Sequence, residues 1–212
     1  MSILDLQQLL INLDNHEARL RRLETQEIGI ATIGGFSLIE ERTPSNVSET
    51  VFSNIPGTFR HLHLRWITKQ LEIAGAVQMG FQFNGDSTAN QYVHSNHTVR
   101  KNLGDSGEGH FISSGPINLI RDGGITGSDV DVPADEFSYG YAYIPYYITD
   151  KWKVIFGRSG GWRVTPILNV DHVMFAGRWK GTAAITSITV SIFLGFPTPL
   201  FAGGTKIALY GI

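Results

Sequence analysis

The first thirty residues carry a spacing of leucines that does not recur later in the chain. In residues 1–30, large aliphatic side chains alternate at intervals of three and four positions, and polar side chains fill the intervals. A stripe this narrow is typical of helices that associate in a coiled coil. We therefore predict a coiled-coil oligomerisation stem over residues 1–30. Its seam positions are Leu6, Leu9, Leu13, His16, Leu20 and Leu23.

An amphipathic helix lying on its own domain is the competing interpretation, because four heptads only just reach the length that defines a coiled coil. Two features favour self-association. The segment ends at Gly29, ahead of a Gly34-Gly35 hinge, and it shares no periodicity with the residues that follow. Leucine at both seam positions leaves the number of helices open, and His16 is a polar layer of the kind that sets register.

After residue 50, apolar and polar residues alternate with the period of two that is typical of strands with one buried face. Leu62, Leu64 and Trp66 share one face of a predicted strand, and Met79, Phe81 and Phe83 share one face of the next. Tyr139, Tyr141 and Tyr143 form a third such row. Further strands are expected at 111–120, 154–156, 164–168, 170–179, 188–194 and 206–210, with glycine and proline turns between them.

This pattern predicts a mainly β protein. Because helices for parallel crossovers are missing, we expect an antiparallel β-sandwich of jelly-roll type, with an Ig-like topology as the alternative. The expected domains are the stem at 1–30, a hinge and entry segment at 31–50 and the sandwich at 51–212. Residues 87–109 are polar and are expected to form a long loop with at most a short strand inside it.

Composition and charge narrow the function. The net charge of −2 provides no basic field, so nucleic acid and anionic membranes are not expected as partners. The chain has no cysteine, and we see neither a secretion signal nor a stretch long and apolar enough to span a membrane. If this protein acts outside a cell, we expect it to leave by another route, such as release as part of an assembled particle.

Three blocks of sequence resemble a group of tailed-phage virion proteins. Residues 52–62 read FSNIPGTFRHL, residues 83–86 read FNGD with Asn90 and Tyr92 following, and the last five residues read ALYGI. In that group, blocks of the form F-x-N-I-P-x-T-Y-R-H-L, F-N-G-D followed by N-Y, and a terminal L-Y-G recur in this order. Phe59 stands where tyrosine is commoner. The resemblance implies a place on a virion, a homotrimer, a β-sandwich head and a coiled-coil stem.

The same blocks have a structural meaning of their own. Ile55-Pro56 favours an extended residue before a turn, and Asn84-Gly85 suits the positive φ angles of a tight turn. Asn84, Asp86 and Asn90 are weak calcium candidates, and an Asx turn is the favoured interpretation. We read these blocks as determinants of the fold.

Candidate binding residues are few, and we expect no cofactor and no metal. His61 and His63 share one strand face and could offer two metal ligands, although paired surface histidines are commoner than zinc sites. Asp129 and Asp131 belong to the densest acidic cluster. Aromatic residues between 139 and 179 suit a sugar or a protein surface, but packing in the core or at a trimer interface is the favoured interpretation. Trp162 is the one expected at an exposed loop tip. The predicted ligand-binding residues are Trp162, Tyr146, Tyr147, Asp129 and Asp131.

These observations predict a non-enzymatic, homotrimeric structural protein of a phage virion. Its expected partners are copies of itself, other virion proteins bound through the stem, and a host-surface glycan or protein. Attachment to the host as a tail fibre or tail-tip protein is the leading expectation. The alternatives are a capsid decoration or head-fibre protein and a carbohydrate-active enzyme, which would need an acidic pair in a groove.

Overall fold

The computed structural model describes residues 35–71, 76–88, 90–102, 105–113, 120–121, 125–127, 138–165, 167–193 and 200–212. Contacts divide the chain into two units, Met1–Ser37 and Leu38–Ile212. Residues 38–50, which we expected to belong to an entry segment, therefore fall in the same unit as the strands that follow. The predicted stem with Leu6, Leu9, Leu13, His16, Leu20 and Leu23 lies outside the described residues and stays a prediction.

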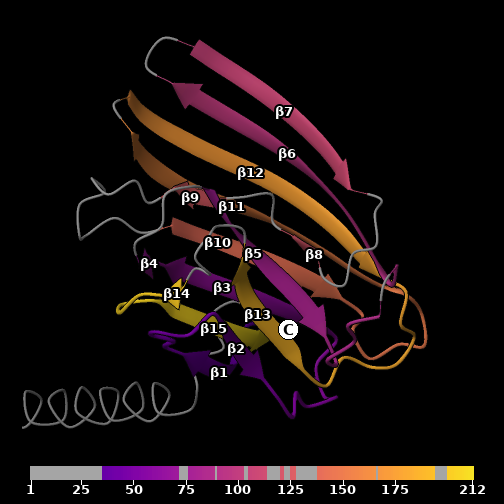
Figure 1. The fold of residues 1–212 in the computed structure, drawn as a ribbon. Helices are drawn as coiled ribbons and strands as arrows, with labels where there is room; N and C mark the ends of the chain where they lie inside the picture. Colours follow the sequence, from indigo (N-terminus) through magenta and orange to yellow (C-terminus); the bar gives the residue numbers. More distant parts are fainter. Residues whose placement is uncertain are drawn as a thin grey trace, which may run out of the picture. The chain divides into compact units, whose positions relative to one another are not determined.

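The larger of two main sheets has the strand order β1-β15-β3-β10-β11-β12-β6-β7 (Figure 1). The pairs from β15 to β7 are antiparallel. Its strands are β1 (Ser37–Arg42), β3 (His61–Thr68), β6 (Tyr92–Asn102), β7 (Asp105–Ser113), β10 (Ser138–Pro145), β11 (Lys153–Thr165), β12 (Ile167–Trp179) and β15 (Lys206–Gly211).

A smaller sheet has the order β2-β13-β5-β8, and β9 also pairs with β5. Its strands are β2 (Glu49–Phe52), β5 (Ala76–Phe83), β8 (Ile120–Arg121), β9 (Ile125–Gly127) and β13 (Ile188–Phe193). A separate two-stranded ladder joins β4 (Gln70–Leu71) to β14 (Leu200–Phe201).

The two main sheets face each other across a single aromatic core. Figure 1 shows β5 and β13 crossing in front of β3 and β10. The ring of Phe81 on β5 lies 5.5 Å from that of Trp66 on β3 and 5.7 Å from that of Phe175 on β12. Phe83 lies 5.7 Å from Trp179 in the same way. All five side chains are buried, so burial of large rings holds the two sheets together.

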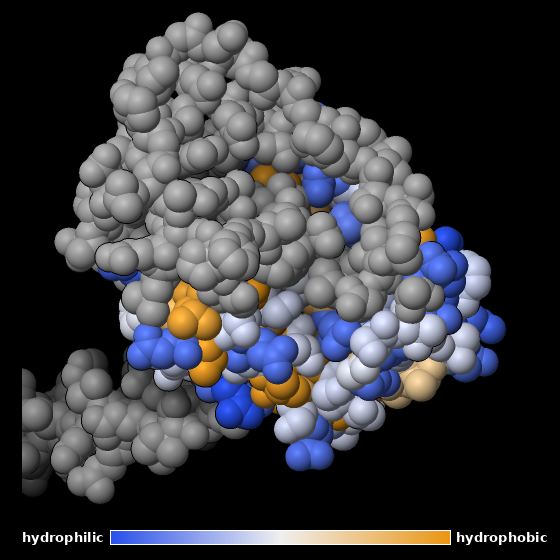
Figure 2. Space-filling model, in the orientation of Figure 1, coloured by the Kyte–Doolittle hydropathy of each residue, from blue (hydrophilic) through white to orange (hydrophobic). Residues whose placement is uncertain are grey.

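The prediction of a mainly antiparallel β fold is confirmed, and the described residues contain no α-helix. The alternating rows point as expected: Leu62, Leu64 and Trp66 are buried on β3, and Phe81 and Phe83 are buried on β5. Within the described ranges there is also no helix long and apolar enough to cross a membrane. On the face drawn in Figure 2, hydrophobic residues of the described part are interspersed with hydrophilic ones.

The expectation of a long loop at 87–109 was wrong. Strands β6 and β7 form a hairpin there, with ladder pairs running from His94–Ser113 to Asn102–Asp105. The inward residues of β6 include His94 and Asn96, which are buried although they are polar. The alternation of apolar and polar residues that marks a strand is therefore missing from this segment.

The expected breaks at Gly157 and at Gly160-Gly161 were also wrong, because β11 runs through all three positions. Gly157 is required by packing. A Cβ atom there would lie 2.1 Å from the carbonyl oxygen of Tyr141 and 2.7 Å from the ring of Phe175. The glycine thus marks a close approach of neighbouring strands rather than a turn.

Candidate functional site

The outward face of the large sheet carries an exposed row of tyrosines. On β10, Tyr139, Tyr141 and Tyr143 point outward because Ala142 and Ile144 on the same strand are buried in the core. Tyr139 and Tyr141 expose 59% and 40% of their surface. Large exposed aromatic groups in a row are uncommon on a surface that contacts only water.

Strand register places three rows of outward side chains across β15, β3 and β10. One row contains Lys206, Ile67 and Tyr139, the next contains Ala208, Arg65 and Tyr141, and the third contains Tyr210, His63 and Tyr143. Residues far apart in the sequence therefore meet on one surface.

These rows enclose a hollow of about 500 Å³, which we call the tyrosine hollow. Its volume lies within the range of small-molecule sites. Ala208 sits between Lys206 and Tyr210 on β15 and is small, so the surface is recessed at its position. The lining residues are Glu41, His63, Arg65, Trp66, Ile67, Tyr139, Gly140, Tyr141, Lys206, Ala208 and Tyr210.

Polar groups in the hollow are organised by contacts with one another. The Arg65 Nε donates to His63 Nδ1 at 3.3 Å, and the Arg65 guanidinium lies 5.4 Å from the centre of the Tyr210 ring. The His63 ring stacks on that of Tyr141 at 5.6 Å. Lys206 Nζ lies 3.8 Å from Glu41 Oε1.

Burial, and then the positive charge of Arg65, lower the pKa of His63 to about 4. The imidazole is therefore neutral at neutral pH. Among the described lining residues, the charged groups are the two cations Arg65 and Lys206 and the single carboxylate of Glu41.

Tyr146 forms a second exposed aromatic group at the end of β10. Its backbone φ is +49°, in the left-handed region that residues other than glycine rarely adopt. The Arg60 Nη2 donates to the Tyr146 hydroxyl at 2.8 Å, and the Tyr146 backbone N–H donates to His61 Nδ1 at 3.2 Å. These contacts hold the ring outward in a strained backbone conformation, a feature that often accompanies functional sites.

The other predicted ligand-binding residues lie elsewhere. Tyr147 is fully buried, and its hydroxyl donates to the carbonyl of Pro56, so it belongs to the core. Trp162 lies inside β11, paired with Val170, and not at a loop tip. Asp129 and Asp131 lie outside the described residues.

His61 and His63 share the outward face of β3 as predicted, but their Nδ1 atoms accept hydrogen bonds from Tyr146 and Arg65. Burial, and then the charge of Arg60, lower the pKa of His61. In the described part of the chain, no three His, Asp or Glu side chains gather in a group that could hold a metal ion.

The Asn84-Gly85-Asp86 turn is used for structure. Asn84 Oδ1 accepts from the backbone N–H groups of Thr186 and Ser187 at 2.8 and 3.1 Å. Asp86 accepts from Trp179 Nε1 at 2.7 Å and from the Thr88 N–H at 3.0 Å, the latter being an Asx turn. Burial alone would raise the pKa of Asp86, but these hydrogen bonds outweigh it and lower the pKa. The side-chain oxygens of Asn84 and Asp86 that were considered for calcium therefore accept hydrogen bonds from other groups of the fold.

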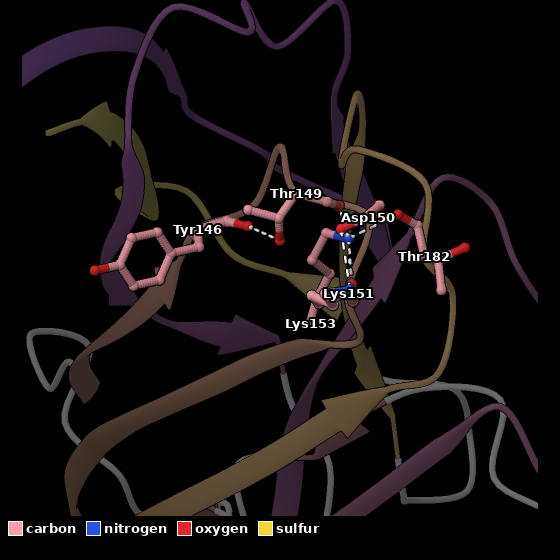
Figure 3. Close-up of polar contacts among 6 residues, drawn as sticks. All are labelled: Tyr146, Thr149, Asp150, Lys151, Lys153 and Thr182. Atoms are coloured by element: carbon pink, nitrogen blue, oxygen red, sulfur yellow. Dashed lines mark hydrogen bonds and ion pairs between the residues drawn. The ribbon is translucent and has the colours of Figure 1, made fainter.

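A buried cation, Lys153, lies at the end of the core and could not be predicted from the sequence. Lys153 is 1% exposed. Its ammonium group donates to the carbonyl oxygens of Thr149, Lys151 and Thr182 at 2.7, 2.6 and 3.1 Å (Figure 3). Burial lowers the pKa of Lys153, and the charge of Asp150 opposes that effect. All three acceptors lie outside the strands, so this lysine joins the loop after β10 to the loop after β12.

No protein-family model matches this chain, and no curated protein matches it either. The outward face of the large sheet combines aromatic rings, a hollow and a rim of mixed charge, which suits binding.

Proposed function

We propose that this protein is a non-enzymatic structural protein of a tailed-phage virion, a homotrimer that presents its β-sandwich at the particle surface and attaches the particle to a host cell. The main support for the attachment role is the exposed row of tyrosines around the tyrosine hollow. Exposed aromatic groups and a concave surface are features of surfaces that bind partners.

The strand order supports the jelly-roll part of this proposal. In a jelly roll, eight strands lettered B to I in chain order form the sheets B-I-D-G and C-H-E-F. If β2, β3, β5, β6, β7 and β8 are strands B to G and β13 is strand I, the smaller sheet reads B-I-D-G.

The larger sheet then reads C-H-E-F when the meander β10-β11-β12 takes the place of strand H. In a meander of three antiparallel strands, the chain begins at one end of the sheet and finishes at the opposite end, as it does in a single strand. The rest of the topology is therefore unaffected by this expansion, and β1 and β15 extend the sheet beyond strand C.

Two features support the trimer. The leucine stripe of residues 1–30 favours association of helices. Beside the tyrosine row, Val154, Phe156 and Met174 are exposed on the outward faces of β11 and β12, and contact between subunits would remove such side chains from water.

The virion assignment is tested by locating this chain on particles from the phage that encodes it. We expect antibodies against the chain to label intact particles at the tail in electron micrographs. Labelling of the capsid surface would favour a decoration or head-fibre protein instead, and absence of the chain from purified particles would exclude both.

A carbohydrate-active enzyme is less well supported. The described lining of the tyrosine hollow contains one carboxylate, Glu41, whereas glycoside hydrolysis ordinarily requires two. Glycan hydrolysis that is lost on replacing Asp129 or Asp131 would overturn the non-enzymatic assignment.

A further inference from the structure

We propose that the tyrosine hollow binds a pyranose ring of a surface glycan. This inference rests on the proposed attachment function and names the class of ligand. Its basis is the combination, on one concave surface, of flat aromatic walls, a recessed floor and polar groups of both charges.

The aromatic walls suit the apolar side of a sugar ring. A pyranose has a face of C–H groups, which pack on an aromatic face and its negative quadrupole. Tyr139 and Tyr141 lie two positions apart on β10, so their side chains rise from the same face about 7 Å apart. Tyr210 stands on the opposite side of the hollow, two strands away.

The rim suits hydroxyl groups, which both donate and accept hydrogen bonds. Arg65 and Lys206 are donors, and Glu41 is an acceptor. A rim of one sign would favour a phosphate or another ion. The mixed rim and the neutral imidazole of His63 favour a ligand that has polar groups and little charge.

The recessed floor depends on Ala208. Ala208 is 7% exposed and lies on the outward face, in register with Arg65 on β3; unlike its neighbours Ile207 and Leu209, it is not part of the core cluster. A larger side chain at this position would fill the hollow without removing any tyrosine and without entering the core. Ala176 on β12 offers a matched control, because it is exposed on the same face and does not line the hollow.

The test is saturation-transfer difference NMR on the full chain with glucose, galactose, N-acetylglucosamine and glucuronate as separate probes. We expect transfer to the C–H protons of at least one sugar, with millimolar affinity. Tyr141→Ala and Ala208→Leu should each weaken binding about tenfold, as expected for loss of an aromatic contact and of the space for the ring. Tyr141→Phe and Ala176→Leu should stay within about twofold of the wild type.

Tighter binding of the neutral sugars than of glucuronate would support a site built on the tyrosine faces. Transfer to glucuronate alone would contradict the inferred preference for a ligand of little charge. Near-ultraviolet circular dichroism checks that each variant is folded. Undiminished binding by Ala208→Leu, or no transfer to any of the four sugars, would overturn the inference.

The outcome is separable from that of the virion assignment. A chain that is present on particles but binds no sugar would overturn only the saccharide site. A chain that binds sugar through the hollow but is absent from particles would overturn only its place on the virion.

Discussion

The ammonium group of Lys153 shows how a single residue can determine the local structure at the end of a core. It is 1% exposed and satisfies three backbone carbonyl oxygens. Buried polar groups are costly when their partners are removed, and hydrogen bonds to a charged donor are stronger than neutral ones.

We therefore expect Lys153→Met to lower the free energy of unfolding by about 3 kcal/mol, because three carbonyl oxygens lose their donor while the chain keeps its apolar volume. Urea denaturation followed by fluorescence measures the change. The control is Lys151→Met, since the Lys151 side chain is 81% exposed and pairs only loosely with Asp150 at 3.6 Å; its effect should stay within about 0.5 kcal/mol. Equal effects of the two substitutions would contradict a structural role for the Lys153 ammonium.

His63 makes the stability of the fold depend on pH. Its pKa is about 4 in the folded chain and 6.5 ordinarily. Between these values the unfolded chain binds a proton that the folded chain does not, so stability falls as the pH decreases from 6.5 to 4 and is unaffected by this group above 6.5. The loss from this residue should approach about 3 kcal/mol at pH 4.

The measurement is the free energy of unfolding of the wild type and of His63→Gln at pH 7, 5.5 and 4.5. Carboxylates that titrate in acid contribute to both proteins, so the difference between them isolates His63. The gap between wild type and variant should narrow as the pH falls. A gap that does not change with pH would mean that folding does not shift the pKa of His63.

At the scale of elements, the turn after β5 is hydrogen-bonded to the backbone of residues 184–187, the segment that leads into β13. Asn84 adopts a φ of 52° and also bonds the backbone of 184–187 through its side-chain amide. Asn90 adopts a similar φ of 68° and is exposed. The two residues therefore differ in their side-chain contacts more than in their backbone strain.

We expect Asn84→Ala to cost about 2 kcal/mol more than Asn90→Ala, because both substitutions place alanine at a positive φ but the first also leaves backbone groups of 184–187 unpaired. Thermal or urea unfolding of the two variants gives the difference directly. Equal losses would assign the whole effect of Asn84 to backbone conformation.

The elements that could be predicted from sequence are those whose inward residues are all apolar. β3 and β13 are examples: Leu62 and Leu64 on the first, and Ile188 and Val190 on the second, are fully buried. β6 was missed because His94 and Asn96 are among its inward residues, and β11 was broken in the prediction because Gly157 reads as a turn. Both strands are formed by pairing and packing with neighbouring strands, although their own side chains lack the usual strand pattern. A local sequence pattern carries no information about those neighbours.

The candidate site was predictable only in part for the same reason. The tyrosine row of β10 follows from alternation within one strand. The tyrosine hollow also needs Ala208 and Tyr210 from β15 and Arg65 from β3, which pairing in the sheet brings beside β10. The role of Lys153 was missed because its partners are backbone carbonyl groups, which every residue has whatever its side chain.

At the scale of the whole molecule, the proposed trimer assigns association of the subunits and folding of the sandwich to different parts of the chain. The unit Leu38–Ile212 has its own aromatic core, so we expect it to fold without residues 1–34. The leucine stripe lies entirely within residues 1–30. Association and folding of the sandwich should therefore be separable by truncation.

We expect the full chain to have three times the 23.4 kDa mass of one copy by light scattering, and a chain restricted to residues 35–212 to be a folded monomer at micromolar concentration. The truncated chain should still unfold cooperatively, because the core lies within it.

Acidification through the histidine range should weaken the full-length trimer, since protonated His16 side chains would repel one another near the helix axis, and His16→Leu should remove that sensitivity. A full chain that is monomeric at neutral pH would contradict the stem. A trimer that survives deletion of residues 1–34 would instead assign association to the sandwich, where Val154, Phe156 and Met174 are the exposed residues to replace next.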